Sequence, residues 1–322
     1  MKPGKVSESI LKRAVIKQLS SKNQNVINSA AIGNDAALIV VSENKYMLSS
    51  TETVIDNYEY QKARALIRAA NNVLAGGGIP KYAQVSIVLP TSSTEADLRN
   101  LFKEYVDAAK SMKIALTGGH TEVSEVILEP MVTVTVIGES DKAYSLKNIQ
   151  PGEDIVMSKA VGLEGSYLLA SKQKEFFETR FAKSYIAKSL QYIDSISVYN
   201  EAAVAIKHGV TAMHDISENG IFGALWEIGE GGNCGLTVDI KSVNIYQETI
   251  ELCEYFDINP YKIPSQGALL MITPNGESLV EALKEAGIDG TVIGKITSGH
   301  DRVIVNEDET RFLEPPRVQK QF

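Results

Sequence analysis

The sequence predicts a two-domain protein of the α/β (α+β) class. Its 322 residues suit about two domains, and 44% of them are hydrophobic, which is enough to build buried cores. Segments with the period of a helix alternate along the chain with short runs of β-branched residues. Neither half shows the regular strand–helix–strand alternation of a doubly wound sheet, so a mixed α/β domain is expected, at least in the second half.

The first half is expected to contain a helix, two strands, a helix, a strand, a helix and a strand. In that order, the elements lie within residues 7–20, 33–41, 45–54, 60–80, 82–89, 91–112 and 131–137. Gly76–Gly78 and Pro80 must end the second helix, because glycine favours a helix C-terminus and proline cannot continue one. A Ser or Thr cap, with Glu95 in the first turn, begins the third helix.

A domain boundary is expected near residue 148, which gives domains 1–148 and 149–322. Pro151 and Gly152 separate a strand that ends at Ile137 from another that starts at Asp154. The later expected elements, in order, are helices around 176–207, a polar turn at 213–220 that leads into a helix closed by Gly231 and Gly232, a strand, strand 265–273, helix 277–286 and strand 291–297.

Composition and charge exclude several classes of protein. A net charge of -8 and a pI near 5.2 argue against nucleic acid as the partner, because phosphate binding needs a basic face, whereas acidity suits a protein that holds cations. Cys234 and Cys253 lack the spacing of a zinc site or a disulfide framework, so reduced thiols are expected. No apolar stretch of about eighteen residues occurs, and the N-terminal apolar residues follow helical spacing. A cytoplasmic protein without a membrane partner is therefore expected.

The segment 115–138 carries the first candidate site. Gly118 and Gly119 are expected to form a glycine turn that lets the backbone approach a ligand, which His120, Thr121 and Glu122 can then face. The alternating Val and Thr residues of 131–137 predict a half-buried strand, which would place the site on the edge of a sheet. The alternative is a tight turn with three solvated polar residues.

Two acidic residues at the ends of predicted strands form a second candidate site. Asp35 follows Gly33 and Asn34 just before a strand, and Glu52 lies between Thr51 and Thr53 at the end of the strand YMLSS, residues 46–50. If these two strands are neighbours, both carboxylates emerge at a sheet end. Hard oxygen ligands there can hold Mg²⁺ beside substrate phosphates.

Other polar residues have both structural and functional interpretations. Asn71 and Asn72 interrupt an alanine-rich helix, where asparagine is mildly unfavourable, so they either have a polar partner or form an exposed pair. His214 and Asp215 precede a helix, where a structural role for Asp215 as N-cap is favoured. Trp226 is expected in the core. No phosphate-binding GxxxxGK[ST] motif is present, and GGGIP after a helix is not a dinucleotide fingerprint.

Seven segments in order resemble the AIR synthase-like ATP-binding superfamily over nearly the whole chain. They are GNDAA (33–37), STET (50–53), AANNVLAGGGIP (69–80), TGGHTEV (117–123), PGEDIVMSKAVGLEG (151–165), MHDISENGIFGALWEIGE (213–230) and SQGALL (265–270). The superfamily includes aminoimidazole ribonucleotide synthetase, thiamine-monophosphate kinase, selenophosphate synthetase and hydrogenase maturation protein E. The last three segments look most like the maturation protein E branch and its AIR synthase-related relatives.

The resemblance implies a fold, two cofactors and a set of site residues. The N-terminal sheets of two copies would pair into a β-barrel in a homodimer, with ATP bound nearby. ATP and Mg²⁺ would serve to phosphorylate an oxygen of an amide or acid substrate, either a small molecule or protein-borne. Asp35 and Glu52 would hold the metal, and Glu122, His120 and Asp215 would be catalytic. The residues expected to contact ATP are Gly33, Asn34, Thr51, Asn71, Asn72, Gly118, Gly119 and Thr121.

The chain also departs from the pattern of this superfamily. Asn34 and Asn72 stand where many members carry acids, and His120 lies in the glycine turn where an acid is usual. Asparagine keeps an oxygen ligand but removes a charge, which weakens the hold on a divalent ion. The sequence ends EPPRVQKQF without the terminal cysteine of maturation E proteins, so another substrate is expected. The alternatives are a non-catalytic nucleotide-binding or assembly protein and, more remotely, a metabolite-binding protein.

Overall fold

The computed structural model describes residues 6–19 and 23–316, which divide into two compact units. Within these residues, the N-terminal unit comprises 25–27 and 35–143. The C-terminal unit comprises 6–19, 23–24, 28–34 and 144–316. The chain thus passes from one unit to the other after Ala143, and the boundary near residue 148 stays a prediction.

The N-terminal unit is built on a six-stranded mixed sheet with the order β1-β2-β3-β6-β4-β5. Its strands are β1 (Val26–Asn28), β2 (Ala37–Ser42), β3 (Lys45–Ile55), β4 (Ile79–Pro90), β5 (Ala115–Ser124) and β6 (Met131–Ser140). β6 runs antiparallel to both β3 and β4, whereas β4 and β5 are parallel. β5 is therefore an edge strand, reached from β4 through a helical crossover.

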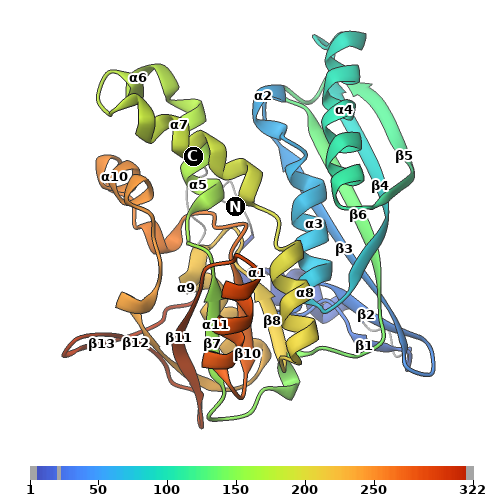
Figure 1. The fold of residues 1–322 in the computed structure, drawn as a ribbon. Coiled ribbons are helices and arrows are strands. Elements are labelled where there is room, and N and C mark those ends of the chain that lie inside the picture. The colour runs from blue at the N-terminus through green and yellow to red at the C-terminus, as the bar shows by residue number, and fades with distance from the viewer. Residues whose placement is uncertain (1–5, 20–22, 317–322) are drawn as a thin grey trace. The chain divides into compact units, whose positions relative to one another are not determined.

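Helices α2 (Tyr58–Gln61), α3 (Arg64–Ala75) and α4 (Glu95–Ser111) belong to this unit, and α3 and α4 lie side by side against one face of the sheet (Figure 1). The predicted alternation of β6 is confirmed, because Val132, Val134 and Val136 are fully buried and the residues between them are half-buried. The other face of the sheet carries the intervening threonines.

The predicted helix ends are confirmed at both long helices of the N-terminal unit. Thr94 caps α4, with its hydroxyl accepting from the Asp97 backbone N–H and the Asp97 carboxylate accepting from the Thr94 backbone N–H. α3 ends at Ala75 and the chain leaves through Gly76–Gly78. A Cβ on Gly76 would lie 2.6 Å from Leu48 Cδ2, so a side chain there has no room.

The predicted glycine turn at Gly118 and Gly119 is wrong, because both residues lie inside strand β5. A Cβ on Gly119 would lie 1.7 Å from the Val85 carbonyl oxygen of the neighbouring strand β4. The register between these strands shifts between Ala83 and Gln84, which brings the two backbones this close. Glycine is therefore required at residue 119 by strand packing.

The C-terminal unit contains a seven-stranded mixed sheet with the order β13-β12-β9-β11-β7-β10-β8. Its strands are β7 (Asp154–Ser158), β8 (Ala212–Asp215), β9 (Gly235–Asp239), β10 (Leu269–Thr273), β11 (Gly290–Thr297), β12 (Arg302–Asn306) and β13 (Glu309–Phe312). Only β12 and β9 are parallel among the pairs of this sheet. Neither sheet of the described chain closes into a barrel, so a barrel formed by two copies stays a prediction.

The remaining elements of the C-terminal unit are helices. The α-helices are α1 (Glu8–Ala14), α5 (Leu163–Lys172), α6 (Lys174–Glu178), α7 (Lys183–Gln191), α8 (Tyr199–His208), α9 (Gly220–Gly231), α10 (Gln247–Tyr255) and α11 (Gly276–Glu285). The 3-10 helices are η1 (Ile16–Gln18), η2 (Leu146–Asn148), η3 (Tyr192–Ser195), η4 (Ile240–Ser242) and η5 (Pro260–Lys262). The helix expected over 7–20 is shorter, because α1 ends at Ala14 and η1 follows; residue 20 lies outside the described residues.

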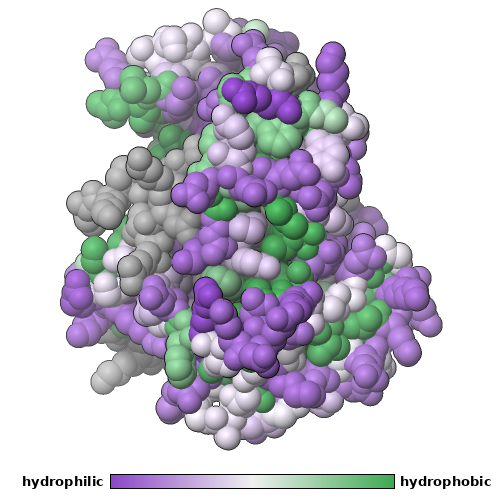
Figure 2. Space-filling view, turned by 90° about the vertical axis from the view of Figure 1, so that its left-hand side faces the viewer, coloured by the Kyte–Doolittle hydropathy of each residue, from purple (hydrophilic) through white to green (hydrophobic). Residues whose placement is uncertain are grey.

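The cysteines and the tryptophan lie where the sequence predicts them. Cys234 and Cys253 are free and buried, as expected, and burial raises the pKa of the Cys253 thiol to about 12, so this thiol stays protonated. Trp226 is buried, as predicted, with Arg302 stacked on its ring. In the described residues no helix combines the length and the apolar character needed to cross a membrane. On the face drawn in Figure 2, hydrophobic residues form separate groups among hydrophilic ones.

Candidate functional site

A buried polar cluster lies where α3 packs on β3. The Asn72 side-chain amide nitrogen donates to Ser50 Oγ and to Glu52 Oε1, both at 2.9 Å. Ser50 and Glu52 share one face of β3, since they are two residues apart on a strand. Asn71 is 0% exposed and Asn72 8%, so the alternative of an exposed asparagine pair is wrong. The polar partners predicted for Asn72 are the Ser50 hydroxyl and the Glu52 carboxylate.

Asp35 belongs to the segment that leads into the neighbouring strand β2. It precedes β2, which pairs with β3 as the sequence analysis required, with Ala37 opposite Ser49. This pairing brings the segment that carries Asp35 next to β3. Carboxylate oxygens of Asp35 and Glu52 and the hydroxyl oxygen of Ser50 are hard donors of the kind that Mg²⁺ prefers, so the donor chemistry of these residues suits a divalent cation.

The predicted position of Glu52 at a strand end is wrong. β3 continues to Ile55, because β6 pairs with it along its whole length, from Tyr46 opposite Ser140 to Ile55 opposite Met131. Glu52 therefore lies in the interior of a long strand. Its carboxylate is held on the helix-covered face by the bond from Asn72.

The sheet separates the predicted catalytic pair from this cluster. Residues paired directly across neighbouring strands share a face, which gives one row of Glu52, Val134, Val85 and Gly119. A second row, Thr53, Thr133, Ser86 and His120, belongs to the opposite face. His120 and Glu122 thus lie on the face that α3 and α4 leave open, and Thr51 lies there too, bonded to Thr135 at 2.9 Å.

Gly119 and Thr121 share the face of Glu52 but lie on the edge strand. Three inter-strand spacings separate β3 from β5, which is roughly 14 Å. The buried side chains of Val134 and Val85 fill the space between them. Within the N-terminal unit, the residues predicted to form one site therefore form two groups: Glu52 with Asn72, and the residues of the β5 edge.

His120 and Glu122 form a hydrogen-bonded pair at the surface. His120 Nε2 lies 3.0 Å from Glu122 Oε2, and their side chains are 63% and 53% exposed. An exposed pair of this kind contributes little to stability, so both groups stay available to a ligand. Gly118 is beside them, and a Cβ placed on it would meet no atom within 4 Å.

Asp215 is held in the C-terminal unit by a residue that sequence reasoning missed. His214 and Asp215 belong to strand β8, so the predicted polar turn starts only after them, and Asp215 is not an N-cap, since Asn219 has that position at α9. Gln266 Nε2 donates to Asp215 Oδ2 at 3.0 Å. His214 Nε2 lies 3.0 Å from Glu227 Oε2, and this pair too is buried.

Gly33 and Asn34 also belong to the C-terminal unit and shape a turn. Gly33 has a φ of +79°, and a Cβ there would lie 2.6 Å from the Glu227 carbonyl oxygen. The Asn34 side-chain nitrogen donates to the Ser29 carbonyl at 2.9 Å. The C-terminal unit thus contains Gly33, Asn34 and Asp215. The other predicted site residues belong to the N-terminal unit.

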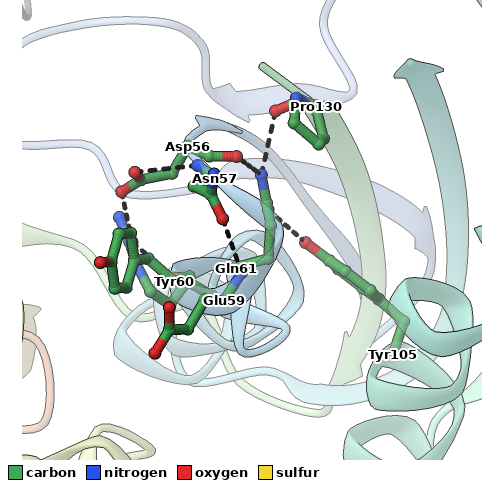
Figure 3. Close-up of polar contacts among 8 residues, drawn as sticks. Asp56, Asn57, Glu59, Tyr60, Gln61, Tyr105 and Pro130 are labelled. Carbon is green, nitrogen blue, oxygen red and sulfur yellow. Dashed lines mark hydrogen bonds and ion pairs between the residues drawn. The ribbon is translucent and has the colours of Figure 1, made fainter. Parts of the chain in front are cut away.

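A second buried network at the start of α3 was not predicted (Figure 3). Gln61 Nε2 donates to the backbone carbonyls of Asp56 at 2.9 Å and Pro130 at 3.0 Å, and the Tyr105 hydroxyl donates to Gln61 Oε1 at 3.3 Å. Arg64 Nη1 lies 3.0 Å from Asp56 Oδ2. Burial raises the pKa of Tyr105, which keeps its hydroxyl protonated as a donor. This network ties α2 to Tyr105 on α4 and to Pro130 just before β6, and the Arg64–Asp56 pair ties the first residue of α3 to the segment that follows β3.

Comparison with known proteins defines the class of this protein. Residues 33–140 match the family model of the AIR synthase related protein, N-terminal domain, and residues 150–306 match that of the C-terminal domain. The chain belongs to the AIR synthase related family. The chain is also similar to proteins named carbamoyl dehydratase HypE, selenide, water dikinase and thiamine-monophosphate kinase, with 20–24% identity.

Particular relatives match over nearly the whole chain. A Methanocaldococcus jannaschii protein named for hydrogenase expression and formation is 24% identical over 312 residues, 94% of this chain and 91% of that protein. The HypE–HypF complex contains a chain with TM-score 0.77 and 17% identity, covering 95% of this chain and 99% of that one. The ThiL complex with AMPPCP and TMP gives TM-score 0.75 and 19% identity, covering 97% and 98%. The two-domain fold predicted from the sequence is thereby confirmed.

Replacing Asn72 by Ala should lower the free energy of unfolding by about 1–3 kcal/mol, because Ser50 and Glu52 would lose a buried donor. Urea denaturation followed by circular dichroism measures this loss. Asn100→Ala, in the exposed part of α4, is the matched control and should change stability by less than about 0.5 kcal/mol. Equal unfolding midpoints for Asn72→Ala and the wild type would show that the cluster does not stabilise the fold.

Proposed function

We propose that this protein is an ATP-dependent enzyme that activates an amide or acid oxygen by phosphorylation. The observation that supports this most is the pair of family models, which match residues in both compact units. A phosphorylated oxygen is a good leaving group, so its formation prepares a dehydration or ring closure. The substrate is proposed to be a small molecule or a protein-borne group.

Asp35 and Glu52 are proposed to hold Mg²⁺. When bound, the ion would neutralise charge on the ATP phosphates. Asn72 fixes the Glu52 carboxylate by its hydrogen bond, which pre-orients that oxygen donor without adding charge. Asn71 and Asn72 are proposed to contact ATP beside this cluster. The proposal that Gly33, Asn34, Thr51, Gly118, Gly119 and Thr121 also contact ATP rests on the resemblance alone, since these residues lie on other strands, on the opposite face of β3 or in the other unit.

Three residues are proposed to act on the reacting groups. His120 would donate a hydrogen bond to a phosphate oxygen, as neutral or cationic imidazole, and Glu122 beside it would orient that ring. Asp215 would accept a proton from the substrate or orient it, since Gln266 holds one of its carboxylate oxygens in place.

The second candidate is a non-catalytic nucleotide-binding or assembly protein. The observation that favours it is Asn72, whose amide nitrogen already satisfies Glu52 where many relatives would place an acid. The chain in the HypE–HypF complex works with another protein, and an assembly role for this chain is proposed by analogy with it. Calorimetric titration with ATP, ADP and Mg²⁺, followed by a phosphate-release assay, separates the enzyme, the binding protein and a protein that binds no nucleotide.

Asp35→Ala should weaken Mg-ATP binding by about tenfold or more and leave folding nearly unchanged, because a charged ligand of the metal is lost. Calorimetric titration with Mg-ATP measures the effect. Glu43→Ala is the matched control, since Glu43 is an exposed acid in the turn that joins β2 and β3, and it should bind as the wild type does. Unchanged affinity in Asp35→Ala would remove Asp35 from the metal site.

Asn72→Asp, alone or with Asn34→Asp, should increase the Mg²⁺ dependence and the basal rate of ATP hydrolysis. Each change adds a charged oxygen near the proposed phosphates, which strengthens the hold on the metal. Phosphate release over a Mg²⁺ titration measures this, with Asn100→Asp on α4 as a control for added charge. Background hydrolysis in both variants, with ATP still bound, would favour the non-catalytic protein.

The protein is proposed to form a homodimer through the sheet of the N-terminal unit. The face that α3 and α4 leave open carries Thr53 and Thr133, whose hydroxyl oxygens lie 3.0 Å apart. Ile55, the last residue of β3, is 64% exposed. A second copy would cover this face and its edge. Light scattering at micromolar concentration should give twice the mass of the chain. Thr133→Arg should produce monomers, whereas Thr91→Arg in an exposed loop should not. A monomeric wild type would contradict the proposal.

A further inference from the structure

The C-terminal unit contains a cavity of about 580 Å³, which is within the range of small-molecule pockets. The cavity is lined by the first turn of α9, by η4 and η5, by the β12–β13 hairpin and by residues 313–316. All these segments belong to one unit. None of the residues proposed above for metal, ATP or catalysis lines this cavity, so it is a separate feature of the protein.

One wall of the cavity is a pair of stacked aromatic rings. The ring centroids of Phe222 and Tyr261 are 5.2 Å apart and the ring planes differ by 10°. Both side chains also pack against the hydrophobic core of the unit, which fixes the orientation of the stack. A rigid aromatic wall favours a flat apolar ligand, because such a ligand covers the wall without disturbing its packing. Phe312, 68% exposed on β13, adds a further apolar surface.

The charged groups of the lining favour an anion. Lys241, Lys262 and Arg311 line the cavity together with two carboxylates, Glu309 and Glu314. Arg311 pairs with Glu309 at 2.8 Å, and Lys241 pairs with Glu307 outside the lining. Within the described part of the chain, no carboxylate pairs with Lys262.

Asparagine side chains supply neutral donors beside Lys262. The Asn259 side-chain oxygen accepts from the Tyr261 backbone N–H at 2.9 Å, so its amide hydrogens remain as donors. Asn219 occupies the N-cap position of α9, where its side chain makes no capping hydrogen bond. Amide donors next to an ammonium group are suited to carboxylate or phosphate oxygens.

We infer that this cavity binds a small organic anion with a flat aromatic body. The ring lies against Phe222 and Tyr261, and the anionic group lies against Lys262 and the asparagine amides. Lys262 is the basic group of the lining that favours an anion over a cation, because Lys241 and Arg311 are paired with carboxylates. This inference is independent of the proposed enzymatic function, since it concerns none of the same residues.

The test uses three probes on the whole protein by calorimetric titration: 1-naphthyl phosphate, 1-naphthol and inorganic phosphate. 1-Naphthyl phosphate should bind with a Kd of about 10–500 µM. 1-Naphthol, which lacks the charge, and inorganic phosphate, which lacks the ring, should each bind at least about tenfold more weakly. Equal binding of naphthol and naphthyl phosphate, or no binding of the phosphate ester at about 1 mM, would overturn the inference.

Variants locate the bound probe. Lys262→Ala should weaken binding of 1-naphthyl phosphate by about tenfold, as expected for loss of one charged hydrogen bond, and Lys262→Glu should weaken it more. Lys284→Ala, on the exposed surface of α11, is the matched control and should bind within about twofold of the wild type. Equal losses in both alanine variants would show a non-specific charge effect and overturn the site.

Two further experiments complete the test. In one, a large side chain fills the cavity, and in the other the probe is titrated in the presence of saturating Mg-ATP. Asn306→Trp, at the end of β12 in the cavity lining, should abolish probe binding, with thermal denaturation as the check on folding. If this variant unfolds, Lys262→Glu still decides, because Lys262 is exposed. Saturating Mg-ATP should leave probe binding unchanged. Displacement of the probe by ATP would place it in the nucleotide site and overturn the separate cavity, whereas failure of ATP to bind would bear only on the proposed enzyme.

Discussion

The N-terminal unit depends on the close approach of α3 to the sheet beneath it. A Cβ on Gly138 would lie 2.4 Å from Val73 Cγ1, and one on Gly76 would lie 2.6 Å from Leu48 Cδ2, so the contact is as tight as glycine allows. A polar side chain buried at such a contact has to be satisfied by groups already there, because an unmet buried donor is costly. Asn72 meets this requirement through Ser50 and Glu52, and the proposed metal site therefore depends on the packing of one helix.

Elements with strong local signals could be predicted from the sequence. α4 has a capping box and an apolar face, and α3 has a glycine stop, so the residues that decide these helices are neighbours in the chain. β5 could not be predicted, because Gly118 and Gly119 locally favour a turn and only pairing with β4 makes them a strand. The interior position of Glu52 was missed for the same reason, since pairing with β6 extends β3 beyond its own apolar run.

The candidate residues could be named from the sequence, but not grouped correctly. Consecutive strand residues point to opposite faces, so Gly119 and His120 cannot serve the same face of the sheet, although the sequence places them side by side. The partners that hold the candidates were missed because they are distant in the chain. Gln266 reaches Asp215 over 51 residues, and Ser50 reaches Asn72 over 22 residues. Side-chain pairs of this kind follow from the fold and carry no local pattern.

This chain carries Asn72 where the resemblance leads one to expect an acid. The difference changes how Glu52 is stabilised. An aspartate at this position would face Glu52 with a second carboxylate, and two close carboxylates need a cation or a shared proton. The Asn72 amide instead donates to both Ser50 and Glu52, so the charge of Glu52 has a donor within the fold itself. The cluster is therefore able to form before any metal binds, and a cation that enters has one carboxylate fewer to hold it. With Asn72 at this position the helix–sheet contact needs no cation between two carboxylates, and the proposed Mg²⁺ would have one charged ligand fewer.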